Sequence, residues 1–250
     1  MKTLSYALLC VLTLLTVSCK DDPAEPTGLK IEFENVVGAE GLTLNDRTYR
    51  NANGDSYTVS QLMYYVSNFS LQKKDGSTYQ VPESYFLIDE AKEASRTITL
   101  TGIPAGDYTG LSFVIGVDST RNTSGAQTGA LDAINGMLWD WNTGYIFVRM
   151  EGNSPQSTQP NGKLQFHIGG FKGATNCIRT ASPSLNGAVI PIRSGKTPEV
   201  HYRVDMSKLF DGPNQVSFSS LSMVHGGPSA VKLADNYQSM FTFDHIHTNE

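Results

Sequence analysis

Apolar and polar residues alternate along much of the chain, and this pattern predicts β-strands in preference to helices. Leu111, Phe113, Ile115 and Val117 occupy every second position of one segment. A period of two is expected for a strand that buries one of its faces. Similar apolar patterns predict further strands at residues 30–37, 61–71, 85–88, 97–100, 145–151, 164–168, 189–192, 200–206 and 215–218.

Helical periodicity marks two short segments. Between residues 229 and 241, apolar residues recur at helical spacing after Ser229, which is a candidate N-cap. Residues 129–134 form the second candidate helix. Glycine, proline and aspartate occupy the connections, as at Asp75-Gly76. Many short strands with few helices predict an all-β fold, an antiparallel β-sandwich or irregular barrel with one or two short helices.

Residues 1–18 have the pattern of a signal peptide that is removed on maturation. Lys2 precedes an apolar run at residues 6–17, which is shorter than the roughly 20 residues that span a bilayer as a helix. The run ends in Leu15-Thr16-Val17-Ser18-Cys19, which resembles a lipobox. Cys19 is therefore the expected site of lipid attachment. The alternative is a plain signal peptide with an incidental cysteine.

The residues after Cys19 predict a lipidated, flexible tether at 19–28, followed by a single domain at 29–250. Lys20-Asp21-Asp22 resembles the surface-export signal of some Gram-negative lipoproteins, although it is also an ordinary beginning for a solvated tether. We expect an outer-membrane lipoprotein on the periplasmic face or the cell surface, and Lys20-Asp21-Asp22 favours the surface. Membrane contact is expected through the lipid alone.

Composition narrows the functional classes. The formal net charge of −5 argues against a surface for nucleic acid. Of the three cysteines, only Cys177 lies beyond the lipidation site, so an internal disulfide is excluded, and this thiol is expected to be a small buried or loop residue. The usual catalytic motifs are missing, and we expect a protein that is not an enzyme.

Histidines concentrate in the last third of the chain, at His167, His201, His225, His245 and His247. In an extended chain the imidazoles of His245 and His247 point the same way, which suits a transition metal such as copper or zinc. Because His167 falls on the polar face of its predicted strand, we expect its ring to be available. Each of these histidines has an ordinary surface role as its alternative.

Both tryptophans of the chain, Trp139 and Trp141, lie two residues apart. If this stretch is extended, both indoles leave the same face of the backbone. They are either core aromatics, a stacking platform together with Tyr145, or a site of modification beside a metal.

Several strings resemble the MbnP-like family, in the same order from about Lys30 to the C-terminus. Two of them are unusual: Trp-x-Trp-x-x-Gly-Tyr from Trp139, and Phe-His-Ile-Gly-Gly from Phe166. All the strings that carry the resemblance lie at residues 64–69, 103–108, 116–119, 129–132, 136–145, 166–170 and 240–247.

The resemblance implies an exported β-domain that binds copper and works beside a di-haem, peroxidase-like enzyme. In that family the enzyme oxidises a tryptophan to kynurenine, which joins histidines at the copper. Carried over, Trp139 or Trp141 is the modified residue and His167 the first copper ligand, with His245 and His247 added by their spacing.

One position departs from the family pattern, in which the opening strand often carries a histidine two residues after a phenylalanine. Here Phe33 is followed by Glu34 and Asn35, and asparagine is a poor copper ligand. The resemblance therefore leaves open whether the copper site is altered, weakened or absent. The leading hypothesis is a copper-binding lipoprotein for copper capture or handling. The alternative is a surface module for glycans or other ligands that uses Trp139, Trp141 and Tyr145.

Overall fold

The computed structural model describes residues 27–139 and 144–248. The predicted signal peptide, Cys19, nearly all of the predicted tether and Trp141 lie outside the described residues. No helix in the described ranges combines the length and the apolar character that crossing a membrane requires.

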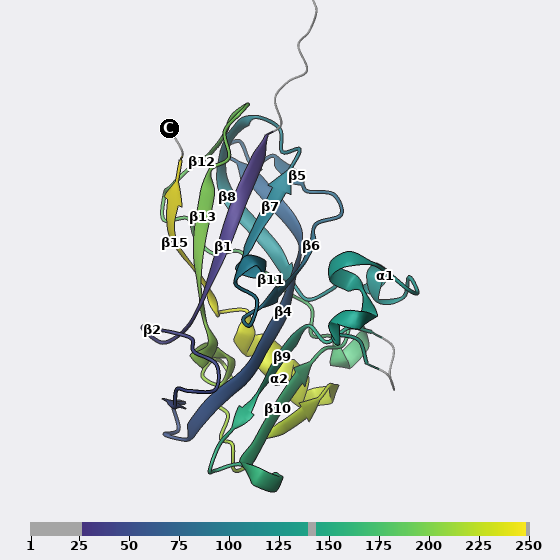
Figure 1. Ribbon diagram of the computed structural model, residues 1–250. Coiled ribbons are helices and arrows are strands. Elements are labelled where there is room, and N and C mark those ends of the chain that lie inside the picture. Colours follow the sequence, from purple (N-terminus) through teal and green to yellow (C-terminus); the bar gives the residue numbers. More distant parts are fainter. Residues whose placement is uncertain (1–26, 140–143, 249–250) are drawn as a thin grey trace, which may run out of the picture.

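Two curled sheets form the protein (Figure 1). The five-stranded sheet has the order β15-β13-β1-β2, with β7 also paired to β1. Its strands are β1 (Gly28–Val37), β2 (Glu40–Gly41), β7 (Thr97–Thr101), β13 (Glu199–Asp205) and β15 (Phe241–His247). All of its pairs are antiparallel except β1 with β13.

The ten-stranded sheet has the order β11-β8-β4-β9-β10-β14, and short strands extend it on both sides. Its longest strand, β4, pairs with five others and runs diagonally through the molecule (Figure 1). The strands are β3 (Tyr49–Arg50), β4 (Ser56–Lys73), β5 (Thr78–Gln80), β6 (Tyr85–Asp89), β8 (Gly106–Ile115), β9 (Val148–Asn153), β10 (Lys163–Ile168), β11 (Arg179–Ala181), β12 (Ile190–Ile192) and β14 (Met223–His225).

A cluster of buried aromatic rings joins the two sheets. Phe33 of β1 lies with its ring centroid 6.4 Å from Tyr64 and 5.8 Å from Phe113, which belong to the other sheet. On its own sheet it contacts Tyr202 at 6.1 Å and Phe241 at 6.2 Å. The alternating residues of β1, β8 and β13 therefore bury one face each, as their period of two predicted. The all-β fold class is confirmed.

Helices are short in the described chain, as predicted: α1 (Ser119–Asn122) and α2 (Gly227–Tyr237). The predicted helix at 229–241 is displaced, because α2 begins after Gly226 and Phe241 already belongs to β15. Residues 129–134 do not form an α-helix. They lie in two 3₁₀ turns, and Asp132 stabilises the second by accepting a hydrogen bond from the Ile134 backbone N–H at 3.0 Å.

The predicted strand at 215–218 is wrong. Gln215 forms one isolated bridge to Asp211. The backbone carbonyl of Val216 and the backbone N–H of Phe218 form hydrogen bonds with side chains and not with a neighbouring strand. The Phe218 N–H donates to Asp55 Oδ2 at 2.8 Å, and the Val216 carbonyl accepts from Asn51 Nδ2 at 3.0 Å. An apolar run is compatible with such a loop when polar side chains satisfy its backbone.

Candidate metal centre

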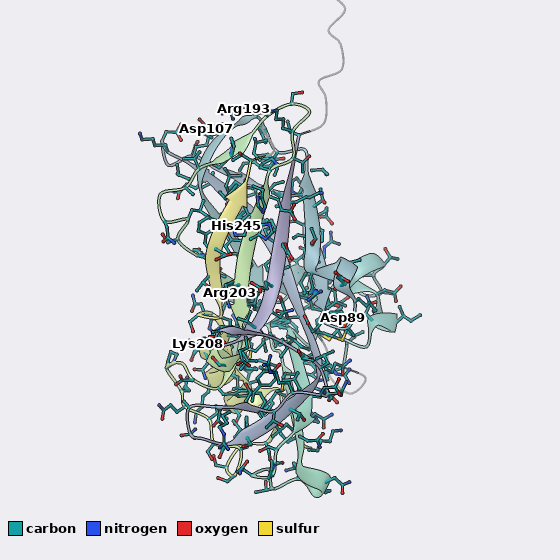
Figure 2. The ribbon with its side chains drawn as sticks, turned by 60° about the vertical axis from the view of Figure 1, so that its left-hand side comes forward. Asp89, Asp107, Arg193, Arg203, Lys208 and His245 are labelled. Carbon is teal, nitrogen blue, oxygen red and sulfur yellow. The ribbon has the colours of Figure 1, made fainter. Side chains whose placement is uncertain are left out.

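Three histidines gather on the outer face of the five-stranded sheet, where Figure 2 labels His245. On β13, Val200, Tyr202 and Val204 are buried, so His201 points outward. On β15, His245 lies opposite His201, and His247 lies opposite Glu199.

A β-bulge sets this register. Tyr202 pairs with Phe243 while His201 pairs with His245, so Asp244 is an extra residue on β15. An extra residue shifts the alternation of a strand by one position. Phe243 is therefore directed toward the core side and His245 and His247 toward the outer side, next to His201.

The donor atoms of the three imidazoles lie within 4.8 Å of one another. His245 Nε2 is 3.1 Å from His247 Nε2. The rings of His201 and His245 are stacked at 4.2 Å with an interplanar angle of 17°. His201 Nε2 is buried and makes no hydrogen bond to any described residue. An unpaired buried nitrogen is costly unless something occupies its lone pair.

A carboxylate contacts the Nδ1 atom of two of these rings. Glu32 Oε2 lies 2.9 Å from His201 Nδ1, and Asp244 Oδ2 lies 2.7 Å from His245 Nδ1. A carboxylate at one ring nitrogen fixes the proton there and leaves the other nitrogen free as a ligand. His201 Nε2 thereby has no hydrogen-bond partner, and His245 Nε2 is hydrogen-bonded to His247 Nε2, which a bound ion would replace.

These donors fit a transition-metal ion. Two nitrogens bound at about 2.0–2.1 Å in tetrahedral geometry are separated by about 3.3 Å, close to the His245–His247 distance. Three imidazoles with an open position are a common ligand set for copper or zinc. We call this cluster of His201, His245 and His247 the three-histidine centre.

His167 does not join the three-histidine centre, because it lies on β10 in the other sheet. Its ring stacks on His225 of β14 at 4.8 Å, and its Nε2 lies 2.8 Å from Glu151 Oε1. Arg149 also bonds that oxygen, at 2.7 Å. The expectation of an available ring is wrong: His167 is only 9% exposed, since residues of the neighbouring strands cover it. Among the described residues, three metal donors do not converge here.

Trp139 lies beside the pair formed by His167 and His225. A Cβ built on Gly169 would be 2.7 Å from Trp139 Cη2, and one on Gly226 would be 3.7 Å from the same atom. Gly169 follows His167 by two residues, and Gly226 follows His225 directly. Trp139 and His167, which the resemblance pairs, are thus close in space, because the Trp139 ring packs against the glycines that follow β10 and β14.

A stacking platform of tryptophans is not supported by the described residues. Trp139 is 7% exposed and Tyr145 is 3% exposed. The Tyr145 hydroxyl donates to the Leu131 carbonyl at 2.7 Å, as a core residue would. Both rings are thus unable to offer a flat face to a sugar, and Trp141 lies outside the described residues.

Asn35 occupies a buried hydrogen-bond network instead of a metal site. Its Nδ2 donates to Glu90 Oε2 at 2.8 Å, and its Oδ1 accepts from the Tyr64 hydroxyl at 2.9 Å. Burial raises the pKa of Glu90. Since both polar atoms of the amide already have partners, the described structure gives Asn35 no free donor for copper.

Cys177 is a buried free thiol, in line with its expected role. Burial raises its pKa to about 12. A protonated thiol is a poor metal ligand and a poor nucleophile.

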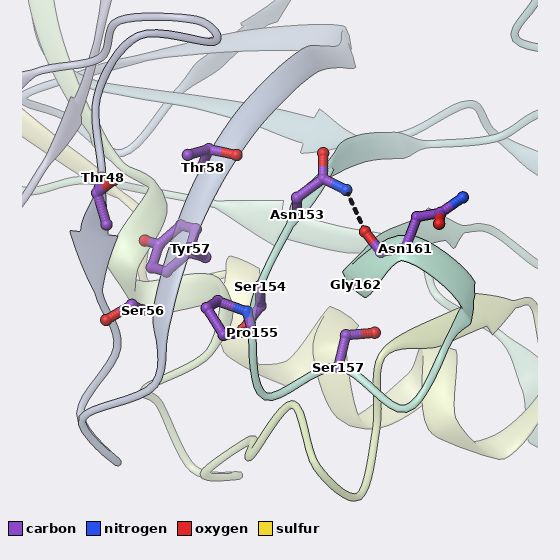
Figure 3. Close-up of a pocket in the computed structure, with 10 residues that line it drawn as sticks. All are labelled: Thr48, Ser56, Tyr57, Thr58, Asn153, Ser154, Pro155, Ser157, Asn161 and Gly162. Atoms are coloured by element: carbon purple, nitrogen blue, oxygen red, sulfur yellow. Dashed lines mark hydrogen bonds between the residues drawn. The ribbon is translucent and has the colours of Figure 1, made fainter.

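One pocket with a neutral lining is separate from both histidine clusters (Figure 3). It has a volume of about 510 Å³, and Asn153 Nδ2 donates across its rim to the Asn161 carbonyl at 3.1 Å. Its lining includes hydroxyl and amide side chains and offers no imidazole, thiolate or carboxylate, which suits an uncharged ligand. The lining consists of Thr48, Ser56, Tyr57, Thr58, Asn153, Ser154, Pro155, Ser157, Asn161 and Gly162.

Burial of His167 predicts a pH-dependent stability. Burial, and then Arg149, lower the pKa of His167 below its ordinary value of 6.5, although Glu151 opposes this shift. The unfolded chain therefore takes up a proton at a higher pH than the folded chain. The contribution of His167 to the free energy of unfolding is therefore fully present above pH 6.5, and it decreases as the pH falls from 6.5 toward the lowered pKa. Thermal unfolding between about pH 7.5 and about pH 5.5 measures the decrease.

The control for this prediction is His167→Gln, which keeps a polar side chain but does not titrate. Glu151 titrates lower: burial raises its pKa, but hydrogen bonds from His167 and Arg149 leave it below 4.5. The contribution of Glu151 to the free energy of unfolding is thus lost only at more acidic pH. An equal decrease in the wild type and His167→Gln over the higher range would contradict the assignment.

Fold and site together define an all-β protein with a surface cluster of converging imidazoles. The model of the MbnP family matches residues 26–226, and the chain belongs to this family. Its structure is similar to MbnP from Methylosinus trichosporium, with a TM-score of 0.58 and 15% identity over 90% of this chain and 100% of that chain. The comparison with curated proteins gives no match.

Family membership confirms the resemblance seen in the sequence and indicates a copper-related role. The residues matched to the family end at 226, so β15 with His245 and His247 lies beyond them. His201 is the ligand candidate that sequence reasoning missed. Its position on the outward-facing side of β13 was readable, but its pairing with β15 was not.

Proposed function

We propose that this chain is a non-enzymatic, copper-binding lipoprotein that takes part in copper capture or handling. The three-histidine centre is its proposed copper site. The observation that carries the proposal is the convergence of three imidazole donors within 4.8 Å, two of them oriented by carboxylates.

Two arguments support copper as the ion. Membership of the MbnP family brings a copper-related role. Among divalent first-row ions, copper is bound most tightly by nitrogen and oxygen donors. An ion at this place is accessible for exchange, because His245 and His247 are exposed on the sheet surface.

The proposed partner is a di-haem, peroxidase-like enzyme, with Trp139 or Trp141 as the residue that it oxidises. Trp139 lies beside the strand ends that carry His167 and His225, which supports this part of the proposal. His167 remains a predicted ligand of a separate centre at that place, where Glu151 holds its Nε2 and its other ring nitrogen would be the donor.

We also propose that Cys19 carries lipid and that the protein is held on the outer membrane, with the cell surface favoured by Lys20-Asp21-Asp22. Radiolabelled lipid precursors would be incorporated by the wild type and not by Cys19→Ala. Protease treatment of intact cells separates the cell surface from the periplasmic face.

Copper titration of the chain without its signal peptide tests the main proposal. We expect one tightly bound copper per chain, and loss of that site in the His245→Ala, His247→Ala double variant. An intact-mass measurement after co-expression with a di-haem enzyme encoded nearby would show whether Trp139 or Trp141 gains oxygen. Copper binding no tighter than that of unrelated histidine-containing surfaces would refute the proposal.

A second candidate function is the binding of a neutral ligand such as a glycan. The pocket in Figure 3 supports it better than Trp139 does, because the pocket is a hollow with an uncharged lining that includes hydroxyl and amide side chains, whereas Trp139 is buried. Binding of neutral oligosaccharides that is lost in Asn153→Ala and retained in the double histidine variant would favour this function.

A further inference from the structure

We infer that an apolar ridge on the loop before Trp139 is the surface on which the di-haem, peroxidase-like partner docks. The ridge consists of Ala133, Ile134, Gly136 and Leu138. This inference rests on the proposed partner enzyme and adds the surface that the enzyme contacts.

The ridge exposes apolar groups to solvent. Ile134 is 89% exposed and Leu138 is 36% exposed, and Ala133 and Gly136 are exposed as well. No charged residue interrupts the sequence from 133 to 138. A single exposed apolar side chain is ordinary, but a run of them on one loop favours a surface for another molecule.

Hydrogen bonds hold the ridge in one conformation. Asp132 accepts from the Ile134 backbone N–H at 3.0 Å, and Asn135 Nδ2 donates to two carbonyls of the preceding turn at 2.9 and 3.0 Å. Gly136 ends the turn with a φ of 70°, in the left-handed region that favours glycine. A fixed anchor loses little conformational entropy on binding, so Ile134 is suited to the centre of an interface.

The ridge borders the residues that the partner is proposed to act on. Trp139 follows it directly in the chain. The Gly136 carbonyl accepts from Arg149 Nη1 at 3.0 Å, and Arg149 also bonds Glu151, which contacts His167 Nε2 at 2.8 Å. A molecule bound on the ridge is therefore close to both Trp139 and His167.

The burial of Trp139 favours a haem protein as the occupant. The indole is 7% exposed, so a haem of the partner cannot contact it directly. The oxidised haems must accept the electrons that the indole loses across the interface, and the rate of this transfer falls steeply with distance. Docking beside Trp139 keeps that distance short, and redox partners commonly use small interfaces, below about 1,200 Å² in total.

A second copy of the chain fits the ridge less well. A stable interface between two proteins takes about 20–30 residues from each side and buries about 800 Å² of each partner. The four residues of the ridge are too few for this, but they suffice for the apolar centre of a small, transient interface with a polar rim.

The test measures the dissociation constant for the purified di-haem enzyme encoded beside this chain, by titration calorimetry. Ile134→Ser is expected to raise it about 10–100-fold, because a buried isoleucine is replaced by a small polar residue. Ile134→Leu is expected to stay close to the wild type. Val189→Ser is the matched control, since Val189 is another exposed aliphatic residue, 41% exposed, just before β12.

Two further measurements show that Ile134→Ser acts through docking alone. At low enzyme concentration, tryptophan oxidation followed by intact mass is expected to slow by the same factor as the binding weakens, and at saturating enzyme it is expected to reach the wild-type rate. Copper binding at the three-histidine centre is expected to be unchanged, because the loop lies beside α1 and away from β15 (Figure 1).

The outcomes separate this inference from the proposed function. Wild-type affinity for the enzyme in Ile134→Ser, or an equal loss in Val189→Ser, overturns the inference and leaves the partner and copper binding intact. A dimer of the chain in sedimentation that Ile134→Ser dissociates assigns the ridge to a second copy and also overturns it. Failure of the wild type to bind the enzyme overturns the inference and the proposed partner together, while copper titration still decides the copper site.

Discussion

Replacing His201 with alanine is expected to weaken copper binding by about 100-fold or more, because a direct ligand should cost at least as much as its hydrogen-bonded support. His201 is the β13 member of the three-histidine centre, and its ring stacks on His245. Without it, the remaining two imidazoles lie on one exposed strand and form a much weaker site. Competition with a copper chelator measures the change.

The matched control is His225→Ala. His225 is an exposed histidine outside the three-histidine centre, so its loss is expected to leave the copper affinity unchanged. Thermal unfolding without metal should give similar midpoints for both variants, because both side chains lie outside the hydrophobic core. If His201→Ala and His225→Ala reduced the affinity equally, the three-histidine centre would not be the copper site.

Phe33→Ala is expected to lower the free energy of unfolding by about 3–5 kcal/mol. Its ring is fully buried, and it contacts aromatic rings of both sheets. Truncation leaves a cavity where the sheets meet, and the surrounding strands cannot close it without giving up their register. Urea unfolding followed by tyrosine and tryptophan fluorescence measures the loss.

Phe33→Leu keeps most of the apolar volume and is expected to lose clearly less stability than Phe33→Ala. Phe243→Ala is a second control. It is also expected to lose less stability than Phe33→Ala, because Phe243, on β15 of the same sheet, is only partly buried. A loss of less than about 1 kcal/mol in Phe33→Ala would show that the aromatic cluster around Phe33 does not stabilise the packing of the two sheets.

The strands were predictable wherever one face is buried. The alternation in 111–117 and 200–206 follows from burial of every second residue, and β8 and β13 confirm it. β15 was not predicted as a strand. Helical spacing extended the preceding helix through Phe241, and the imidazoles of His245 and His247 were placed together only on the condition that the chain is extended there. A local pattern cannot choose between two periods where one element gives way to the next.

The metal centre was predictable only in part, because it is formed by pairing between strands. The spacing of His245 and His247 placed their imidazoles together, and the structure does so. His201 is 44 residues away in sequence, and only the register of β13 with β15 brings it there. His167 was misjudged for the same reason: its strand has a polar face, but residues of β9 and β14 cover that face.

The bulge at Asp244 also affects whether further strands can add to the edge of the five-stranded sheet. β15 ends the order of the five-stranded sheet, so one side of its backbone has no strand partner among the described residues. Such an edge is a template on which a further strand can add, and the addition can continue into aggregates. The bulge twists the edge, and Asp244, His245 and His247 line it with polar side chains. The residues that gather the metal donors therefore also protect the sheet against uncontrolled growth.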